Sequence, residues 1–470
     1  MTIVFEAERR EDMQLAIAIA EAARREGGYA LIVGGYTRDV VLQRMGHDVV
    51  PKDLDIEVYG LAFERIATLL QRLRPGPLDV VGAAFGVIKF GRLDVSLPRR
   101  DSKVGPGHRG FHIEGDPTMP VEEASRRRDF TINAMAHDPL TGALIDPHGG
   151  VEDLRRRTLR ATDPAYFGDD PLRVLRAMQF AARFGFSIDA DTAALCRQLD
   201  MRELPRERIG EEWLKMLQKA RRPSTGLAVA RDLGVLAQLH PELDALIDVP
   251  QEPQWHPEGD VWTHTEMVVD EAADIVQRES LVGDEALVIL LGALCHDLGK
   301  PATTAFDEAR GRITAHGHEP AGVTPTKSFL RGINVRQDIV RKVGQLVRYH
   351  LYPAMNTDPS EASLRRLATR LFPATIRELV WVSEADQRGR AVPWSGFPSG
   401  EALVERATTL AVADAPAPPV VRGRHLILWG LDPGPEFGVI LRQLYEAQLE
   451  GVVTTVEDGR AYYQDKHPRV

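Results

Sequence analysis

The sequence predicts an α+β protein in which a mixed α/β N-terminal domain precedes a mostly helical remainder. Strand and helix patterns alternate up to about residue 140, and helical periodicity dominates from about residue 153 onward. The 470 residues also exceed what one hydrophobic core usually spans. Several domains are therefore expected.

The hydrophobic pattern predicts the order of the N-terminal elements. An amphipathic helix over about 12–25 precedes YALIVGG (29–35), which reads as a strand that ends in a glycine turn. TRDVVLQRM (37–45) then predicts a helix. The next elements are a strand, a helix and a hairpin-like pair of strands, over 53–60, 62–73 and 85–100.

Proline-bearing segments mark the expected domain boundaries in the helical part. They lie at residues 247–260, 392–401 and 413–421. We therefore expect four parts, over residues 1–140, 141–248, 249–395 and 396–470.

Composition and charge exclude several classes of protein. Apolar residues make up 43% of the chain and charged residues 27%, which is ordinary for a folded domain and not for a disordered one. The formal net charge of −10 argues against a protein that coats DNA. Two cysteines, Cys196 and Cys295, form no disulfide framework, and no apolar run reaches the roughly 20 residues of a membrane helix. We expect a cytoplasmic protein with neither a membrane nor DNA as a partner.

Acidic residues gather near a glycine turn in the N-terminal domain. Asp53 and Asp55 are two residues apart on a strand and share a face, and Asp94 lies on a strand that could pair beside theirs. Gly34 and Gly35 open a helix whose N-terminal amides can bind an anion. A solvated strand edge and a simple turn are the bland interpretation. Together these residues favour Mg²⁺ sites that act on phosphates, because Mg²⁺ prefers a few carboxylates plus substrate phosphates.

Five motifs in this order resemble a known family. They are LIVGGYTRDVVL, KDLDIEVYG, RRDFTINAMAHD, DDPLRVLRAMQFAARFGF and LPRERIGEEWLK, within about residues 28–220. The chain resembles the bacterial tRNA nucleotidyltransferase/poly(A) polymerase family, which includes the CCA-adding enzymes. The resemblance implies a polymerase-beta-like nucleotidyltransferase head at 1–140 and a helical, RNA-binding neck at 141–248.

The resemblance also implies residue roles. Asp53 and Asp55 are expected to bind the catalytic Mg²⁺, and Asp94 is expected to be a third acid of this site. The residues expected to hold the nucleotide are Gly34, Gly35, Arg38, Arg128, Asp129, Asn133, Asp170, Arg173 and Arg176. The implied partners are the tRNA 3′ end, CTP and ATP.

Asp170 and Arg173 are the residues implied to read the incoming base. Cytosine and adenine each present an amino group beside a ring nitrogen, which suit a carboxylate acceptor and a guanidinium donor. The spacing predicts that both lie on one helix face. An ordinary surface ion pair is the alternative. Asp169 and Gln179 depart from the commoner Glu and Arg of the family, and the second departure affects a phosphate or tRNA contact rather than the chemistry.

Histidines and an aspartate mark a second candidate site. HTEMVVDEA, ALCHDLGKPATT, AHGHEPAG and VRYHLYP supply His264, His296, Asp297, His318 and His350. Neutral imidazole plus carboxylate suits a transition metal that activates water. The segment resembles the HD phosphohydrolase superfamily, with Asp386 as the expected distant aspartate. The resemblance makes His318 and His350 ligands if two metals bind, and substrate contacts if one binds.

The two resemblances together imply a known arrangement. In some members of the tRNA nucleotidyltransferase family, the head is followed by an HD domain that has phosphodiesterase and phosphatase activity toward 2′,3′-cyclic and 2′-phosphate ends. Lys300 is expected to neutralise a phosphate, and His256 and His316 to be solvent or packing residues. The metal expected at this HD site is a divalent transition metal of unspecified identity.

Three functions remain open at this point. The first is CCA addition with an HD phosphohydrolase activity. The second keeps the head but makes another product, as a poly(A) polymerase or an enzyme that adds only CC or only A. The third is an RNA-binding or nucleotide-sensing HD phosphohydrolase with an inactive head. Basic segments such as LRRRTLR would meet the RNA, because the net charge of the whole chain is negative.

Overall fold

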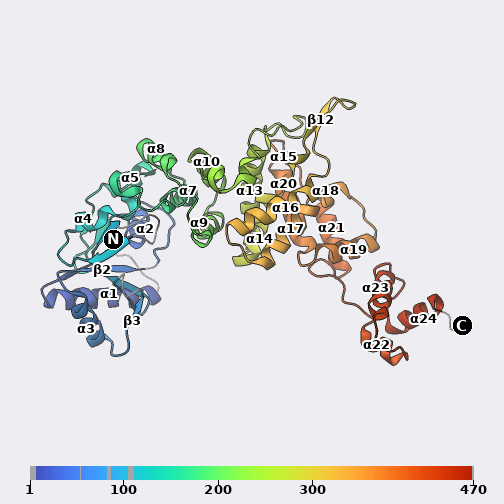
Figure 1. Ribbon diagram of the computed structural model, residues 1–470, viewed down its shortest axis with the longest axis horizontal. Helices are drawn as coiled ribbons and strands as arrows, with labels where there is room; N and C mark the ends of the chain where they lie inside the picture. The colour runs from blue at the N-terminus through green and yellow to red at the C-terminus, as the bar shows by residue number, and fades with distance from the viewer. Residues whose placement is uncertain (1–6, 53, 82–85, 104–110, 468–470) are drawn as a thin grey trace. The chain divides into compact units, whose positions relative to one another are not determined.

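The structure is a computed structural model that describes residues 7–52, 54–81, 86–103 and 111–467. The chain divides into two compact units (Figure 1). The N-terminal unit comprises Met1–Pro205 and Asp232–Gln238, and the C-terminal unit comprises Arg206–Arg231 and Leu239–Val470.

A seven-stranded sheet forms the centre of the N-terminal unit, in the order β3-β4-β5-β2-β1-β8-β9. Strand β2 pairs with β5 in parallel, whereas the other neighbours pair antiparallel. The bounds are β1 Tyr29–Val33, β2 Asp55–Tyr59, β3 Asp79–Val81, β4 Val87–Phe90, β5 Leu93–Ser96, β8 Ala136–His137 and β9 Leu144–Ile145. A separate hairpin is formed by β6 Arg99–Lys103 and β7 Phe111–Gly115.

The two faces of this sheet have different roles. Ile56 and Val58 of β2 point into a core with helices α1 (Ala7–Arg25) and α3 (Phe63–Leu73), which cover one face (Figure 1). Residues two apart on a strand share a face, so Asp55, Glu57 and Tyr59 point to the opposite side. Burial of side chains such as Ile56 contributes about 1.5–3 kcal/mol each. This core fixes which face of β2 carries the acids.

Shorter elements and a long helix complete the N-terminal unit. The expected strand, turn and helix over 29–45 are confirmed as β1 and α2. The helices and 3-10 turn are α2 Gly35–Arg44, α4 Val121–Arg126, η1 Thr131–Asn133, α5 Gly150–Arg156, α6 Pro164–Phe167, α7 Leu172–Phe184 and α8 Ala190–Gln198. Two short parallel strands, β10 (Thr158–Leu159) and β11 (Ser187–Ile188), interrupt a region that the sequence predicts to be almost wholly helical.

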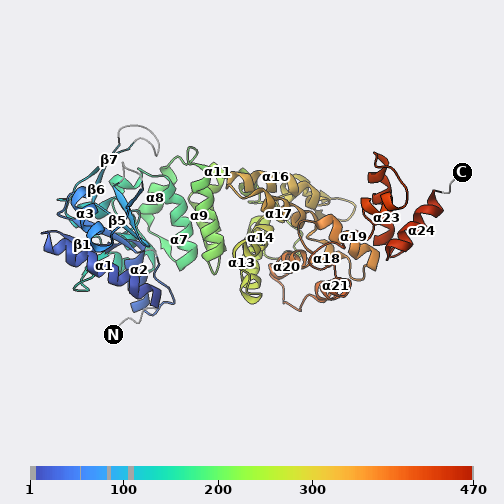
Figure 2. The same ribbon diagram turned by 90° about the horizontal axis from the view of Figure 1, so that it is seen from below.

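Helices build the C-terminal unit, which confirms the α+β class. Helices α16 and α17 pack side by side, as do α13 and α14 (Figure 2). The helices up to residue 409 are α9 Arg206–Lys219, α10 Ser224–Asp232, α11 Val235–Leu239, α12 Pro241–Asp244, α13 Val261–Arg278, α14 Gly283–Cys295, α15 Lys300–Thr303, α16 His318–Gly332, α17 Gln337–Tyr349, α18 Tyr352–Met355, α19 Glu361–Leu371, α20 Ile376–Arg388 and α21 Pro398–Thr409. Of these helices, α10 and α11 each cross the boundary between the two units.

Helix α14 is the centre of this helical core. Each of its residues from Ala286 to Cys295 is buried, because α13, α17 and α20 pack around it. Within the described ranges one segment, Gly283–Thr303, has the length and mean hydropathy of a membrane-crossing helix, and 83% of its apolar window is buried inside the protein. The burial accounts for the apolar composition of this segment.

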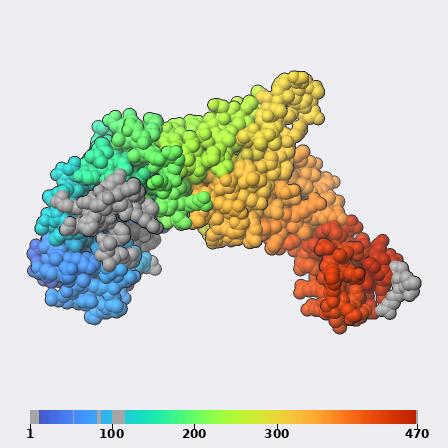
Figure 3. Space-filling view, in the orientation of Figure 1, coloured from blue at the N-terminus to red at the C-terminus, as the bar shows by residue number. Residues whose placement is uncertain are grey.

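Two peripheral elements extend from the C-terminal unit. The hairpin of β12 (Ala305–Asp307) and β13 (Arg312–Thr314) projects from the helices around it (Figures 1 and 3). The last helices have a hydrophobic core of their own and are α22 Gly423–Leu428, α23 Glu436–Leu449 and α24 Val456–Lys466. Arg366 of α19 pairs with Glu446 and Glu450 of α23, at 3.3 and 2.6 Å.

Candidate functional sites

The turn between β1 and α2 brings three predicted residues together. Gly34 has φ of 76°, in the left-handed region that favours glycine. A Cβ atom at Gly34 would lie 3.0 Å from Nη1 of Arg128 and 3.7 Å from Oδ2 of Asp55. A bare backbone turn at a helix N-terminus therefore lies between a guanidinium and a carboxylate, which is a suitable arrangement for a phosphate and a metal.

Asp55 and Asp94 are partners across the parallel strands β2 and β5. Residues in register share a face of the sheet, so both carboxylates are on the side of the glycine turn. Lys89 of β4 lies opposite Asp94, and its ammonium is 2.7 Å from Oδ1 of Asp94. The Asp94 side chain is 40% exposed. Asp53 lies outside the described residues, so the predicted acidic pair is described through Asp55 alone.

Arg38 is held inside the protein behind this turn. Its Nε and Nη2 atoms lie 2.8 and 2.7 Å from Oδ1 of Asp39, and its Nη1 donates to Oδ1 of Asn133 at 2.6 Å. The guanidinium also lies over the rings of Phe180 and Phe184, 5.3 and 4.9 Å from their centroids. Burial lowers the pKa of Arg38, although Asp39 opposes this effect. Whether Arg38 contacts a triphosphate stays a prediction.

Asp129 joins two other predicted residues, Asn133 and Arg176. Its Oδ1 accepts hydrogen bonds from the Phe130 amide at 2.8 Å and from Nδ2 of Asn133 at 2.9 Å. Its Oδ2 accepts from Nε of Arg176 at 2.6 Å. Burial alone would raise the pKa of Asp129, but Arg176 and these hydrogen bonds lower it. The buried carboxylate is therefore charged and fixes Asn133 and Arg176 in place.

The structure corrects the prediction that Asp170 and Arg173 lie on one helix face. Helix α7 begins at Leu172, and the Asp170 carboxylate accepts from the Leu172 amide at 3.1 Å. Asp170 therefore precedes the helix, because a short acid is more stable as an acceptor for the unpaired amides there. Arg173 donates to the backbone carbonyls of Tyr166, at 2.6 Å, and of Arg127.

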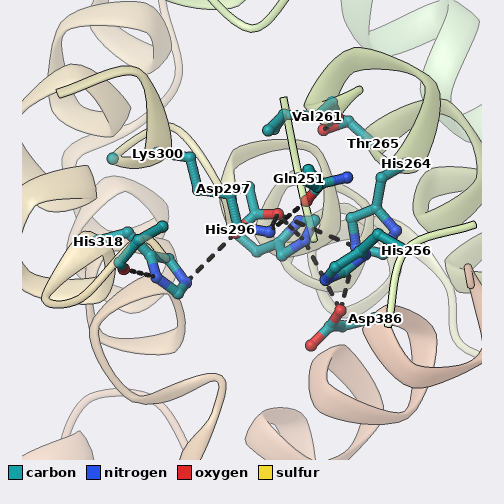
Figure 4. Close-up of polar contacts among 12 residues, drawn as sticks. Gln251, His256, Val261, His264, Thr265, His296, Asp297, Lys300, His318 and Asp386 are labelled. Carbon is teal, nitrogen blue, oxygen red and sulfur yellow. Dashed lines mark hydrogen bonds and ion pairs between the residues drawn. The ribbon is translucent and has the colours of Figure 1, made fainter. Parts of the chain in front are cut away.

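The second candidate site lies inside the C-terminal unit. The six predicted ligands come from five helices or their ends, and all are buried: His264, His296, Asp297, His318, His350 and Asp386. Figure 4 shows His264, His296, Asp297 and Asp386 directed toward one another, with His318 on the far side of Asp297. Tertiary packing thus assembles residues that span more than a hundred positions of sequence.

The ligands form two groups of three that could each hold a metal ion. In the first group Nε2 of His264 lies 3.1 Å from Oδ1 of Asp386, and Nε2 of His296 lies 4.0 Å from the same oxygen. The second group consists of Asp297, His318 and His350. The two groups adjoin through Asp297.

Asp297 faces both groups. Its Oδ2 lies 3.1 Å from Nε2 of His296, and its Oδ1 lies 3.3 Å from Nε2 of His318. The Nε2 atoms of His318 and His350 are 3.3 Å apart. Each oxygen of the Asp297 carboxylate therefore faces an imidazole of a different group.

The tautomer of three histidines is set by the backbone. In His296, His318 and His350, Nδ1 lies 2.7–2.8 Å from the carbonyl oxygen three residues earlier in the chain. A carbonyl only accepts, so Nδ1 carries the proton and Nε2 has the lone pair that a metal requires. Burial lowers the pKa of His350 to about 3, which keeps this ring neutral.

Buried polar atoms without hydrogen bonds indicate that these groups fit a metal ion. Within the described part of the chain, Nε2 of His296 and Oδ2 of Asp386 have no hydrogen-bond partner. The oxygens of Asp297 have only ion-pair neighbours, among them the Lys300 ammonium at 2.7 Å from Oδ2. Burial would raise the pKa of Asp297, but His296 and Lys300 hold it well below its usual value. Such atoms require another partner, and nitrogen and carboxylate donors suit a transition metal.

The proline-bearing segment 247–260 contributes residues that the sequence did not predict. Oε1 of Glu258 lies 2.8 Å from Nδ1 of His264 and 2.9 Å from Nδ1 of His256. Gln251 accepts from the Lys300 ammonium at 2.6 Å. Burial would lower the pKa of His264, but the carboxylates of Asp386 and Glu258 raise it.

The prolines of this segment predict a domain boundary, and that interpretation gave its polar residues Gln251 and Glu258 no role in the site. Their position six to thirteen residues before His264 was the one available signal. His256 packs against His264, with ring centroids 4.7 Å apart, and His316 is exposed and lies 3.1 Å from Arg310.

Family models match three parts of the chain. They are the Poly A polymerase head domain over residues 30–160, the probable RNA and SrmB-binding site of polymerase A over 185–247, and the HD domain over 261–415. The multifunctional CCA protein of Xanthomonas campestris pv. campestris (strain B100) is 38% identical over 424 residues, which cover 87% of this chain and 95% of the relative. The chain belongs to the multifunctional CCA protein family.

A second multifunctional CCA protein, from Stenotrophomonas maltophilia (strain K279a), is 37% identical over 387 residues, 79% of this chain and 89% of its own. Solved structures share the fold. The Bacillus stearothermophilus CCA-adding enzyme in complex with CTP matches with a TM-score of 0.64 and 21% identity, covering 97% of each chain. The Thermotoga maritima CCA-adding enzyme complexed with tRNA matches with a TM-score of 0.59 and 18% identity, covering 98% of this chain and 96% of its own. The nucleotidyltransferase and HD domains of multifunctional CCA proteins imply divalent metals, and the described residues include groups able to hold them.

Proposed function

We propose that this protein is a tRNA nucleotidyltransferase that adds CCA to the tRNA 3′ end from CTP and ATP without a nucleic-acid template, and that its HD domain is a phosphohydrolase. Relatives named multifunctional CCA protein, alike over nearly their whole length, carry the first part of the proposal. The geometry that supports it is the placement of both Asp55 and Arg128 beside the Gly34 turn.

In the head, the chain's own residues bind and orient the nucleotide. The backbone amides after Gly34 and the guanidinium of Arg128 receive the triphosphate, since a helix N-terminus binds anions and Nη1 of Arg128 lies beside the turn. Asp55, together with Asp53 and Asp94, holds Mg²⁺, which when bound activates the RNA 3′-hydroxyl and stabilises the leaving pyrophosphate. Little else is required, because phosphoryl transfer depends mainly on position and charge.

Base selection falls to Asp170 and Arg173. The carboxylate accepts from the amino group of cytosine or adenine, and the guanidinium donates to the neighbouring ring nitrogen. Uracil and guanine place a carbonyl where the amino group would be, so they leave Asp170 facing an acceptor. The two carbonyls that bind Arg173 fix its plane before the base arrives.

The HD site is proposed to hold two divalent transition-metal ions. His264, His296 and Asp386 hold one, and His318 and His350 hold the other, with Asp297 between them. When bound, the ions supply a water nucleophile near neutral pH. Lys300 pairs with Asp297 at 2.7 Å and is the cation proposed to neutralise a substrate phosphate. The proposed substrates are 2′,3′-cyclic and 2′-phosphate ends.

We also propose four parts of the chain: a head at 1–140, a neck at 141–248, an HD domain at 249–395 and a C-terminal region at 396–470. The proposed location is the cytoplasm. The alternative of a poly(A) polymerase is not favoured, because the relatives alike over most of the chain are named for CCA. The alternative of an RNA-binding or nucleotide-sensing HD phosphohydrolase with an inactive head is not favoured, because Asp55 and the Gly34 turn are both present.

The deciding experiment offers each labelled NTP separately, with Mg²⁺, to tRNA transcripts that end before the first C, after the second C, or with the complete CCA. CMP incorporation on the first transcript and AMP on the second are expected. Long A tails would support the polymerase instead, and incorporation of a single nucleotide type would support a CC-only or A-only enzyme. Hydrolysis of 2′,3′-cyclic AMP with added Ni²⁺, Co²⁺ or Mn²⁺ tests the HD site.

A further inference from the structure

Glu57 is a buried acid that the residue roles above leave without a function. It lies on β2 two residues after Asp55, on the same face, and only 3% of the residue is exposed. Burial of a lone carboxylate is costly, so its partners indicate why the strand tolerates it. The carboxylate contacts two arginines and a tyrosine hydroxyl.

The two oxygens of Glu57 have different partners. Oε2 accepts from the Tyr59 hydroxyl at 2.7 Å. Oε1 lies 3.2 Å from Nη2 of Arg127 and 3.4 Å from Nη2 of Arg128. Burial and the adjacent carboxylate raise the pKa of Tyr59, so its hydroxyl stays protonated and donates. Tyr59 thus fixes one oxygen and leaves the other directed at the arginines.

The contact with Arg128 determines where the rest of that guanidinium points. Nη2 of Arg128 faces Glu57, whereas Nη1 faces the Gly34 turn, 3.0 Å from where a Cβ would stand. A guanidinium is planar and rigid, so anchoring one nitrogen sets the direction of the other. The nitrogen left toward the turn is the one that could meet a phosphate.

Charge leads to the same conclusion. Arg127 and Arg128 are adjacent in the chain and about three-quarters or more buried, and two such cations repel each other in a site of low dielectric. The Glu57 carboxylate lies within 3.4 Å of both guanidinium groups and offsets part of this repulsion. A triphosphate at the turn would offset more of it.

We propose that Glu57 is a positioning residue for nucleotidyl transfer, which acts by holding Arg128 against the Gly34 turn in the orientation that receives the triphosphate. The inference rests on the proposed function of the head. Glu57 itself touches neither the nucleotide nor the metal. Its effect on the reaction therefore passes through Arg128.

A double-mutant cycle tests this dependence. The variants are Glu57→Gln, which keeps the shape and removes the charge, Arg128→Met, which keeps the stem and removes the guanidinium, and the pair together. We expect kcat/KM for CTP to fall about tenfold in Glu57→Gln, and to fall by less than about twofold when the same change is made beside Arg128→Met. Independent, multiplying losses would overturn the proposal, as would an unchanged kcat/KM in Glu57→Gln.

A matched control separates positioning from general stability. Glu26 also holds two arginines, Arg65 at 3.0 Å and Arg72 at 3.2 Å, but it directly follows α1 and both arginines belong to α3, away from the residues around Gly34. Glu26→Gln should leave kcat/KM for CTP unchanged. An equal loss of kcat/KM in Glu26→Gln would overturn the proposal, because it would assign the effect to the fold.

Two further measurements keep the proposal testable. If Glu57→Gln fails to fold, Tyr59→Phe decides, since it removes only the hydroxyl that fixes Glu57; a smaller loss in kcat/KM is expected, and no loss overturns the proposal. If the wild-type protein incorporates no nucleotide, the proposed function fails separately. CTP binding by equilibrium dialysis with Mg²⁺ then still compares Glu57→Gln with the wild type, and equal affinities overturn the positioning role.

Discussion

At the scale of single residues, the HD site depends on which histidine nitrogen faces the centre. Three of the four rings are oriented by backbone carbonyls, and His264 is oriented by Glu258. A carboxylate behind a ligating imidazole fixes the tautomer and increases the basicity of the nitrogen that faces a metal. Glu258 is thus as much a part of the site as the predicted ligands.

Glu258→Gln should weaken metal binding at the HD site. An amide can still accept from His264 but lacks the negative charge, so we expect affinity for Co²⁺ or Mn²⁺ to fall about tenfold or more. Metal titration followed by hydrolysis of 2′,3′-cyclic AMP measures the effect. Glu308→Gln, at an exposed acid of the β12–β13 hairpin, is the control and should change neither quantity. Wild-type affinity in Glu258→Gln would contradict the role of Glu258.

His240 gives the C-terminal unit a defined response to acid. Its Nε2 accepts from the indole Nε1 of Trp213 at 2.9 Å, and burial lowers the pKa of His240 to about 3. The unfolded chain protonates this ring near pH 6.5, so between these values the unfolded state binds more protons and stability falls as pH falls.

From pH 7.5 to pH 5.5, His240 alone should lower the free energy of unfolding by about 1.4 kcal/mol. Urea unfolding followed by tryptophan fluorescence measures this change. The His240→Gln variant has no titrating side chain at position 240. Its free energy of unfolding should therefore fall by about 1.4 kcal/mol less than that of the wild type over the same pH range. An identical pH dependence in the two proteins would show that His240 becomes protonated in the fold.

At the scale of elements, the N-terminal site is a property of one strand, turn and helix. Strand β1 is buried on both sides of the sheet, and α2 begins one residue after Gly34. The left-handed φ at Gly34 lets the chain reverse without a side chain above the helix N-terminus. The absence of a side chain at Gly34 keeps the turn clear of Arg128 and Asp55, whose Nη1 and Oδ2 atoms would lie 3.0 and 3.7 Å from a Cβ there.

Gly34→Ala should impair nucleotide use more than it impairs folding. A methyl group would occupy the turn 3.0 Å from Arg128, in addition to straining a φ of 76°. Gly46→Ala is the matched control, because Gly46 has φ of 88° and nothing within 4 Å of its Cβ position. Both changes should cost about 1 kcal/mol of stability. Only Gly34→Ala should raise the KM for CTP, and equal KM values would contradict this role of the turn.

At the scale of the whole molecule, the two candidate sites lie in different compact units. The residues around Gly34 belong to the N-terminal unit, and the six buried histidines and aspartates of the HD site belong to the C-terminal unit. All described side chains of each site belong to a single unit. The two activities should therefore be separable.

Asp55→Ala should abolish CMP incorporation and leave hydrolysis of 2′,3′-cyclic AMP intact. His296→Ala combined with Asp297→Ala should have the reverse effect. Parallel assays of both activities on each purified variant, with circular dichroism to confirm folding, make the comparison. Loss of both activities from one folded variant would contradict the two-site organisation.

The sequence by itself determined the α+β class, the strand, turn and helix around Gly34, and the six residues that the structure brings together in the C-terminal unit. These features follow from local hydrophobic pattern, from residue spacing and from the order of motifs. All three can be identified in a single amino-acid sequence. It placed Asp170 inside a helix, because a spacing of three residues cannot reveal that the helix begins at Leu172.

Only the tertiary structure decided which polar groups support those residues. Glu57 is separated from Arg128 by 71 positions, and Asp386 is separated from His264 by 122. Glu258 lies near His264 in sequence, but its contact requires the proline-bearing segment to fold back against α13. Such contacts arise from packing between elements, and no periodicity within an element encodes them.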